Sequence, residues 1–313
     1  MISPIPQKAP KPKTAREIAF MSEAAKVVNE ALWAGRAMAR PGVRTVEIDQ
    51  AVEALYSRYG AVPVFKGYPR PHAPFPAATC LSVDEQVLHG IPAPRLPREG
   101  DLLKINTACK LNGWCAMAAT TVPIGTVRPE KLRLVQVAEE MLEIAQVELP
   151  RRNWWSEVAE RMQRHAEDAG YSVVEEYGGH GIGRMLHETP FVPNFVSRDE
   201  RRAGQQDFRL VPGLVLSITP LVNMGKSAVK ISSQWTVVTA DGMPSVHVQR
   251  TLVLTPNGVH VVTDAACAAC NGRGRMLLLF KCRSCNGSGW RKQPSLQGSD
   301  FPQAADPGRS LFI

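Results

Sequence analysis

The order of helical and strand-like segments is the feature that most constrains the fold. Apolar residues recur at helical spacing in two segments near the amino terminus and in two more near the middle of the chain, and strand-like runs follow each pair. The expected helices cover residues 14–40, 45–59, 129–147 and 155–169. The expected later strands cover residues 214–219, 235–239 and 246–254, with a hairpin turn over 255–258 that leads into 259–262. This alternation predicts an α+β domain that ends near Thr263.

Local signals mark the ends of the first two helices. Thr14 and Glu17 have the spacing of a capping box, Pro41 and Gly42 stop the first helix, and Gly60 suits the end of the second. Residues 61–125 contain many prolines and are interpreted as short strands and loops. Residues 1–13 form an expected flexible basic leader, and residues 293–313 an expected disordered tail, because neither has apolar periodicity.

Composition narrows the class of protein. The chain has 313 residues, 44% of them hydrophobic, which is enough for one large domain with a sizeable core. Its apolar runs stay shorter than the roughly 18 residues of a membrane span, and the amino terminus has no apolar signal region. A cytoplasmic protein with no membrane partner is therefore expected. The net charge of +8 points only weakly to an acidic partner.

Four of the seven cysteines crowd into a short segment near the end of the chain. The pattern C-x-x-C-x-G-x-G occurs twice there, fifteen residues apart, and its cysteines are Cys267, Cys270, Cys282 and Cys285. Two such knuckles make a closed tetrahedral site, so the segment 264–292 is predicted to bind one structural zinc ion. Metal binding would supply most of its folding free energy, on the order of 10 kcal/mol. The repeats resemble the cysteine-rich module of J-domain co-chaperones.

This module is also basic. Its cationic side chains are Arg273, Arg275, Lys281, Arg283, Arg291 and Lys292, and no acidic residue lies between Cys267 and Lys292. A cationic zinc module is suited to RNA phosphates, so the ribosome or another RNA is one expected partner. A protein-docking surface and a merely solvated surface are the alternatives.

Several phrases in the main domain occur in one order: VDEQVLHGIP at 83–92, GDLLKIN at 100–106, YGGHGIGRMLHETP at 177–190, SITPLVNMGK at 217–226 and WTVVTADGMPSVHVQRTLVLTPNG at 235–258. Together they make residues 14–263 resemble the type I methionine aminopeptidases. The resemblance implies the pita-bread fold, a pseudo-symmetric pair of αβ halves with a metal site between them. It also implies removal of the initiator methionine by two divalent ions, which are held by two Asp, one His and two Glu.

This chain departs from that ligand set. The matching positions hold Asn106, Met117, His180, Thr219 and Gln249, so the histidine is kept and all four carboxylates are replaced. Four neutral side chains cannot balance the charge of two divalent ions. No dinuclear metal is therefore expected in the main domain. A single weakly held ion on His180, with Cys109, Cys115 or His187, is an alternative, although the two cysteines are better explained as small buried side chains.

The resemblance also implies a pocket for the methionine side chain. The matching residues are Phe65, Tyr68, Cys80, His89, Leu186 and Trp235, while His187 matches a second histidine of the catalytic site. Residues 70–79 depart from the family pattern at the expected mouth of this pocket. His180, His187 and His89 are the candidate acid–base groups, since histidine titrates near neutral pH.

These observations lead to three hypotheses of function. The first is an inactive relative that binds a peptide amino terminus, a protein, or the ribosome and RNA. The second is an enzyme with altered chemistry, metal-free or with a single ion, in the same cleft. The third and least favoured is an active methionyl aminopeptidase.

Overall fold

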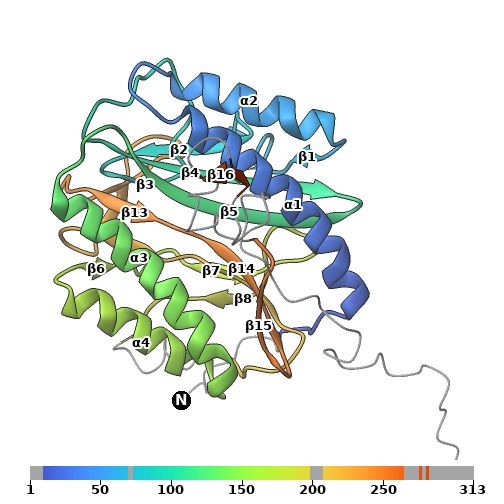
Figure 1. Ribbon diagram of the computed structural model, residues 1–313. Coiled ribbons are helices and arrows are strands. Elements are labelled where there is room, and N and C mark those ends of the chain that lie inside the picture. Colours follow the sequence, from blue (N-terminus) through green and yellow to red (C-terminus); the bar gives the residue numbers. More distant parts are fainter. Residues whose placement is uncertain (1–9, 70–72, 198–206, 264–274, 277–279, 282–313) are drawn as a thin grey trace, which may run out of the picture.

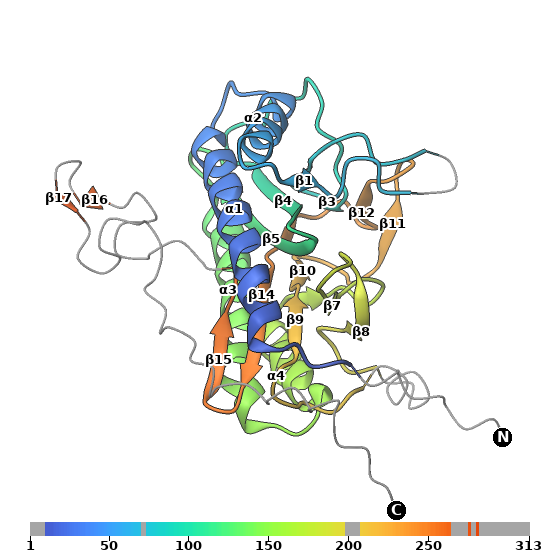
Figure 2. The ribbon, with the colours of Figure 1, turned by 90° about the vertical axis from the view of Figure 1, so that its right-hand side faces the viewer.

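Figure 1 shows a computed structural model, which describes residues 10–69, 73–197, 207–263, 275–276 and 280–281. It confirms the mixed α/β pita-bread architecture, with two helix pairs against short sheets. All strand pairs within the described ranges are antiparallel. Helices α1 and α3 lie on one side of the sheets, and β8, β11 and β12 lie on the other (Figure 2).

The first half of the domain is built on helices α1 (Ala15–Met38) and α2 (Thr45–Arg58). The capping box is present, since the Glu17 amide donates to Thr14 Oγ1 at 3.3 Å and the Thr14 amide donates to Glu17 Oε2 at 2.9 Å. The apolar faces of both helices pack on one sheet, whose strands are β1 (Val62–Pro63), β2 (Thr79–Val83), β4 (Leu102–Leu111) and β5 (Trp114–Pro123).

Strands β4 and β5 correct the expectation of short strands over 61–125. Each has ten residues, and they join at a turn in which Asn112 and Gly113 both have positive φ, 51° and 80°. An Asn-Gly turn of this kind closes a tight hairpin. Nearly every residue of the hairpin is buried, so its sequence has no alternation of apolar and polar residues to reveal a long strand.

The second half repeats the plan with α3 (Pro129–Glu148), a short 3₁₀ turn (Leu149–Arg151) and α4 (Trp155–Asp168). Their buried faces share one core with the strands of this half. The flanking sheet has the order β13–β10–β6, with bounds Ser245–His247, Leu221–Asn223 and Ser172–Val173. The four helices therefore begin and end within a few residues of their predicted positions.

Two further sheets complete the domain. The five-stranded sheet has the order β15 (Gly258–Val261), β14 (Arg250–Thr255), β9 (Val215–Ile218), β7 (Gly179–Gly181) and β8 (Glu188–Val192). The three-stranded sheet has the order β11 (Val229–Ile231), β12 (Val237–Thr239) and β3 (Gln86–Leu88). The hairpin predicted at 255–258 is confirmed by the pairing of β14 with β15.

The strand predicted over 246–254 is split in two. After β13 the chain leaves one sheet, and β14 joins another. Between them Gln249 bridges to Ala119 of β5, with an amide-to-carbonyl distance of 3.2 Å in one direction and 3.1 Å in the other. This backbone bridge joins the two halves of the domain.

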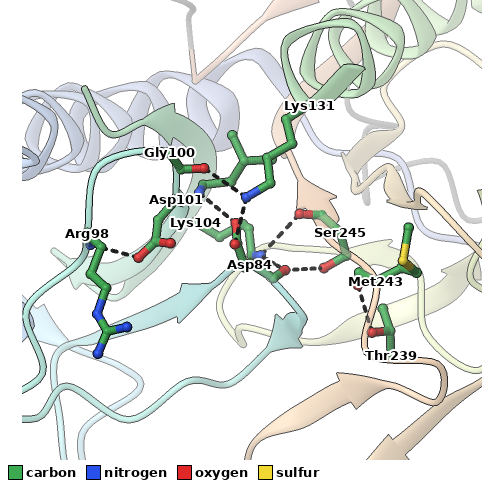
Figure 3. Close-up of polar contacts among 10 residues, drawn as sticks. Asp84, Arg98, Gly100, Asp101, Lys104, Lys131, Thr239, Met243 and Ser245 are labelled. Atoms are coloured by element: carbon green, nitrogen blue, oxygen red, sulfur yellow. Dashed lines mark hydrogen bonds and ion pairs between the residues drawn. The ribbon is translucent and has the colours of Figure 1, made fainter. Parts of the chain in front are cut away.

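A buried polar network around Asp84 provides a second connection between the halves (Figure 3). The Lys131 Nζ donates to Asp84 Oδ2 and to the Gly100 carbonyl, each at 2.7 Å. The Lys104 Nζ donates to the Asp84 carbonyl at 2.5 Å and to the Ser245 carbonyl at 3.1 Å. Strand β4, helix α3 and strand β13 are thereby held to one aspartate.

The predicted zinc ligands Cys267, Cys270, Cys282 and Cys285 lie outside the described residues. Within the segment 264–292 the described residues form one antiparallel pair, β16 (Arg275–Met276) with β17 (Phe280–Lys281). At the other end of the chain, Lys13 is attached to the domain, because its amide donates to the Gly213 carbonyl at 2.7 Å. Across the described ranges, no helix has the length and apolar character needed to cross a bilayer.

Candidate active site

A cavity of about 580 Å³ opens where the sheets of the two halves meet. All twelve positions assigned from the resemblance, apart from the zinc cysteines, line it: Phe65, Tyr68, Cys80, His89, Asn106, Met117, His180, Leu186, His187, Thr219, Trp235 and Gln249. These residues come from segments spread over most of the domain. The fold therefore brings the predicted residues together in one cleft.

His180 lies on β7, between glycines that allow close approach of the neighbouring strands. A Cβ atom on Gly179 would lie 2.0 Å from the Ser217 carbonyl oxygen, and one on Gly181 would lie 2.3 Å from that of Thr189. Strand β7 can therefore sit between β8 and β9 with His180 turned into the cleft. His180 Nδ1 lies 2.9 Å from the Gly181 carbonyl oxygen, which can only accept. Nδ1 therefore carries the proton, and Nε2 carries the lone pair.

His187 stands against His180, with 4.3 Å between their ring centroids. The Tyr68 hydroxyl lies 2.8 Å from His187 Nδ1 and orients the ring. Burial and the neighbouring His187 lower the pKa of His180 to about 4, and burial lowers the pKa of His187. At pH 7 His180 is therefore a neutral imidazole that can accept a proton.

The other four ligand-matching positions lie deeper in the cleft. Asn106 is on β4, Met117 is on β5, Thr219 follows β9, and Gln249 lies at the bridge between β13 and β14. The side chains of Asn106, Thr219 and Gln249 are at least nine-tenths buried, and Asn106 Oδ1, Thr219 Oγ1 and Gln249 Oε1 have no hydrogen-bond partner. Unpartnered buried oxygens of this kind are uncommon in structural positions.

These donors do not fit two divalent ions. The positions that the resemblance assigns to the ligands supply two amides, a thioether, a hydroxyl and one imidazole, without a carboxylate. Among the described residues, no group of three or more His, Cys, Asp and Glu side chains is placed to hold a metal ion. Neutral donors leave most of the charge of a divalent pair uncompensated.

The two acidic residues of the cleft are at its rim. Glu176 is exposed, and Glu188 accepts from Lys13 Nζ at 2.6 Å. Lys13 and the hydrogen-bonding amide of Met185 hold the pKa of Glu188 below its ordinary value, against the effect of burial. At the inner end, burial with nearby His89 and Lys104 lowers the pKa of His247 to about 3. His247, like His180, is therefore neutral at pH 7.

Aromatic side chains form the apolar wall. Phe75 meets Trp235 edge to face, with 5.2 Å between centroids, and Trp235 Nε1 donates to the Ala73 carbonyl at 3.1 Å. Sequence reasoning did not assign Phe75, Tyr177, Phe191 or His247 to the cleft. Phe75 could have been found, since it lies in the segment 70–79 that departs from the family pattern.

Cys109 and Cys115 do not join His180 in the cleft. Both are fully buried; the Cys109 Sγ lies 3.7 Å from the Ala24 carbonyl, and the Cys115 Sγ lies 3.6 Å from the Arg184 carbonyl. Burial raises their pKa values to about 12 and about 11. The interpretation as small buried side chains is confirmed, and neither thiol lines the cleft that contains His180.

Comparison with known proteins places the fold and the cleft in one family. A sequence model of the Metallopeptidase family M24 matches residues 19–256, and the chain belongs to that family. Among its relatives, the methionine aminopeptidase of Clostridium perfringens is 38% identical over 256 residues, which cover 80% of this chain and 97% of the relative. Methionine aminopeptidase 1 of Bacillus subtilis is 36% identical over 252 residues, 80% of this chain and 98% of the relative.

Solved structures give the same result. The crystal structure of methionine aminopeptidase from Thermotoga maritima superposes with a TM-score of 0.74 at 32% identity, covering 81% of this chain and 99% of that chain. The structure from Rickettsia prowazekii also gives 0.74, at 28% identity. The homology to type I methionine aminopeptidases inferred from the motifs is thereby confirmed, and membership of this family implies the use of metal.

The first hypothesis of function, an inactive relative that only binds, is wrong on these comparisons. Relatives 36–38% identical over 80% of this chain are methionine aminopeptidases, which favours an active enzyme. The hypothesis took four positions as decisive and gave less weight to the rest of the cleft. The other positions matched to the family also line the cleft, including the histidine pair and the apolar wall.

Proposed function

We propose that this protein is an aminopeptidase that removes an amino-terminal methionine from peptides, with altered chemistry in the family cleft. The observation that carries the proposal is the His180–His187 pair, 4.3 Å apart at the ring centroids, beside an apolar pocket. A cavity of about 580 Å³ accommodates a methionine side chain and the next residue of a peptide. The aromatic residues and Cys80 suit the thioether of methionine.

His180 and His187 have different roles in this proposal. His180 Nε2 has a free lone pair, because Nδ1–H is bonded to the Gly181 carbonyl, and so it is the general base. In this proposal the Tyr68 hydroxyl, 2.8 Å from His187 Nδ1, is the donor of their hydrogen bond, and His187 Nε2–H is then a donor toward the carbonyl oxygen of the substrate. Tyr68 is a positioning residue, since it acts through His187.

The reaction is hydrolysis of the first peptide bond. His180 accepts a proton as the oxygen of water bonds to the carbonyl carbon, and His187 donates a hydrogen bond to the carbonyl oxygen. The bond from that carbon to the nitrogen of the second residue then breaks. The proton passes from His180 to this nitrogen, which leaves as the new amino terminus, and free methionine is the other product.

The replacement of the four family carboxylates is part of the same proposal. Asn106, Met117, Thr219 and Gln249 carry no charge, so we infer that the main domain works without a pair of divalent ions. These side chains lie together in the lining of the cleft, and none of them is a carboxylate.

The test is cleavage of a Met-Ala-Ser peptide by the full chain, followed by release of free methionine. The expected result is turnover that persists in a chelator and is unchanged by added Mn²⁺ or Co²⁺. Turnover that requires an added divalent ion would overturn the metal-free chemistry, and no turnover under either condition would overturn the aminopeptidase. An Asn106→Asp variant assayed with and without metal shows whether one restored carboxylate returns metal dependence.

The carboxy-terminal module is a separate proposal. We propose that Cys267, Cys270, Cys282 and Cys285 bind one structural zinc ion, and that the basic module contacts the ribosome or another RNA, with a protein as the alternative partner. The duplicated spacing and the local excess of Lys and Arg support this, and the substrate suggests a cytoplasmic protein. Metal analysis should find one zinc per chain that is lost with Cys267→Ser. Absence of co-sedimentation with ribosomes at low salt would exclude the RNA partner.

A further inference from the structure

Three unpartnered oxygens in the cleft identify a binding site beyond the histidine pair. Asn106 is 4% exposed, Thr219 is 4% exposed and Gln249 is 1% exposed, and each has a side-chain oxygen without a hydrogen-bond partner. All three residues line the same cavity. A buried acceptor left unpaired costs about 1–3 kcal/mol, so three together point to a ligand that completes them.

The orientation of Gln249 is fixed by its own contacts. Its Nε2 donates to Ser217 Oγ at 2.7 Å and lies 3.3 Å from Met117 Sδ, a thioether that can only accept. The nitrogen therefore belongs on that side, and Oε1 is left as an acceptor, which the His247 side chain approaches without a well-formed hydrogen bond. Backbone bonds in both directions with Ala119 hold the residue in place.

Strand register places two of these acceptors on the same face of neighbouring strands. Asn106 pairs with Ala119 across β4 and β5, and Ala119 bridges to Gln249, so the three residues lie in one row on the same face. The middle position contributes only a methyl group. Met117, two residues before Ala119 on β5, lies beside Gln249, with its Sδ 3.3 Å from Gln249 Nε2.

The charged residues around the cavity favour a positively charged ligand. Within the described residues that line the cavity, there is no Lys or Arg, while Glu176 and Glu188 are at the rim. Asn106, Thr219 and Gln249 carry no charge, and an anion would find no lysine or arginine in the lining. A divalent ion would find too little negative charge. A singly charged group that donates several hydrogen bonds fits both requirements.

We infer that Asn106, Thr219 and Gln249 bind the protonated α-amino group of the substrate peptide, in the place where the family resemblance puts metal ions. This inference rests on the proposed function. An ammonium group has three N–H donors, which match the three oxygens in number. In an aminopeptidase substrate this nitrogen is two bonds from the carbonyl carbon. Ser217, which holds Gln249, pairs with His180 across β9 and β7, so the two subsites are neighbours.

Through this site the protein recognises the free amino terminus of its substrate. A formylated or acetylated peptide has no ammonium group and would leave the three oxygens unpaired. Selection against a blocked terminus thus comes from unpaired polar groups, which discriminate more strongly than apolar contacts do.

The experiment is calorimetric titration of the full chain carrying His180→Asn, which turns the peptide over too slowly to disturb the measurement, with Met-Ala-Ser and with N-acetyl-Met-Ala-Ser in a chelator. We expect acetylation to weaken binding about tenfold or more, since a hydrogen bond to a charged group contributes about 1.5–3 kcal/mol. Thr219→Val should weaken binding of the free peptide and leave the acetylated peptide unaffected. Thr255→Val is the matched control, because Thr255 is a buried threonine in the β14–β15 hairpin, outside the residues lining the cleft.

Equal affinity for the two peptides would overturn the inference, and so would a Thr219→Val variant that weakens both alike. Asn106→Asp gives a gain-of-binding test, since a carboxylate of the same shape should strengthen binding of the free peptide only. The two proposals fail separately. If the protein cleaves Met-Ala-Ser but binds the free and acetylated peptides equally, the ammonium site is contradicted and the aminopeptidase activity is supported. If the acetylated peptide binds more weakly but the free peptide is not cleaved, the ammonium site is supported and the aminopeptidase activity is contradicted.

Discussion

The cleft and the Asp84 network are two buried polar regions that share strand β4. Lys104 and Asn106 are two residues apart on that strand, and so they lie on the same face. Around Lys104 the charged groups are paired: Lys131 and the Leu102 amide donate to the Asp84 carboxylate, and Lys104 donates to two carbonyls. Around Asn106 the groups are neutral, and three oxygens have no partner.

This difference distinguishes polar groups that stabilise the fold from polar groups that are available to bind a ligand. In the Asp84 network each ion has a partner in the protein, so removing one leaves another uncompensated (Figure 3). In the cleft the missing partners belong to another molecule, so removing a side chain costs the fold little. Substitutions in the two regions should therefore affect different measurements.

The largest effect is expected for Asp84→Ala. Lys131, whose side chain is 7% exposed, would lose its carboxylate, and the free energy of unfolding should fall by about 3–5 kcal/mol. Urea unfolding measures this. Glu160→Ala is the control, because Glu160 pairs with Arg164 on the exposed face of α4 and should change stability by no more than about 0.5 kcal/mol. Equal effects of the two variants would contradict the structural role of the network.

The next effect is on catalysis. His180→Asn should lower the turnover of a Met-Ala-Ser peptide about 100-fold or more, because the general base is lost, while the unfolding transition stays nearly unchanged. Initial rates and thermal unfolding of the same samples test both parts. His165→Asn, a change on α4 outside the cleft, should keep full turnover. A His180 variant with normal turnover would remove this residue from the mechanism.

A smaller effect is expected from the titration of Lys104. Burial lowers its pKa from the ordinary 10.5 to about 7, against the attraction of Asp84 and Glu85. Between about pH 7 and pH 10.5, Lys104 is protonated to a greater extent in the unfolded chain than in the folded chain. The contribution of Lys104 to the free energy of unfolding therefore rises with pH. Relative to Lys104→Met, the free energy of unfolding should rise from pH 7 to 10 by at most about 1.4 kcal/mol per pH unit. Parallel pH profiles of the two proteins would show that Lys104 stays charged.

The smallest effect is expected for Asn106→Leu. Leucine has a similar shape and carries no unpaired oxygen, so stability should be unchanged or rise by up to about 1 kcal/mol. Thermal unfolding measures this, and binding of the free peptide in the same buffer should fall. A loss of more than about 2 kcal/mol would place Asn106 with the structural residues and blur the distinction between the two regions.

The sequence predicted the four helices, the family and twelve of the residues that line the cleft, because these depend on periodicity and on motifs in a fixed order. It did not reveal the β4–β5 hairpin, since strands buried on both faces show no alternation. The Asp84 network was also missed: Asp84, Lys104 and Lys131 are far apart in sequence, and nothing local shows that a lysine is buried. The inactive relative favoured by the four ligand positions is contradicted by similarity over the whole domain.

The bridge between Ala119 and Gln249 has a consequence for how such a site can change. Backbone pairing fixes Gln249, and the β4–β5 ladder fixes Asn106, so neither side chain sets the course of its strand. An amide and the corresponding carboxylate have the same outline and differ in one terminal atom. At these two positions the charge of the side chain can change while its shape stays the same. Evolution could therefore replace the amide by the carboxylate, or the reverse, and leave the strands of the cleft in place.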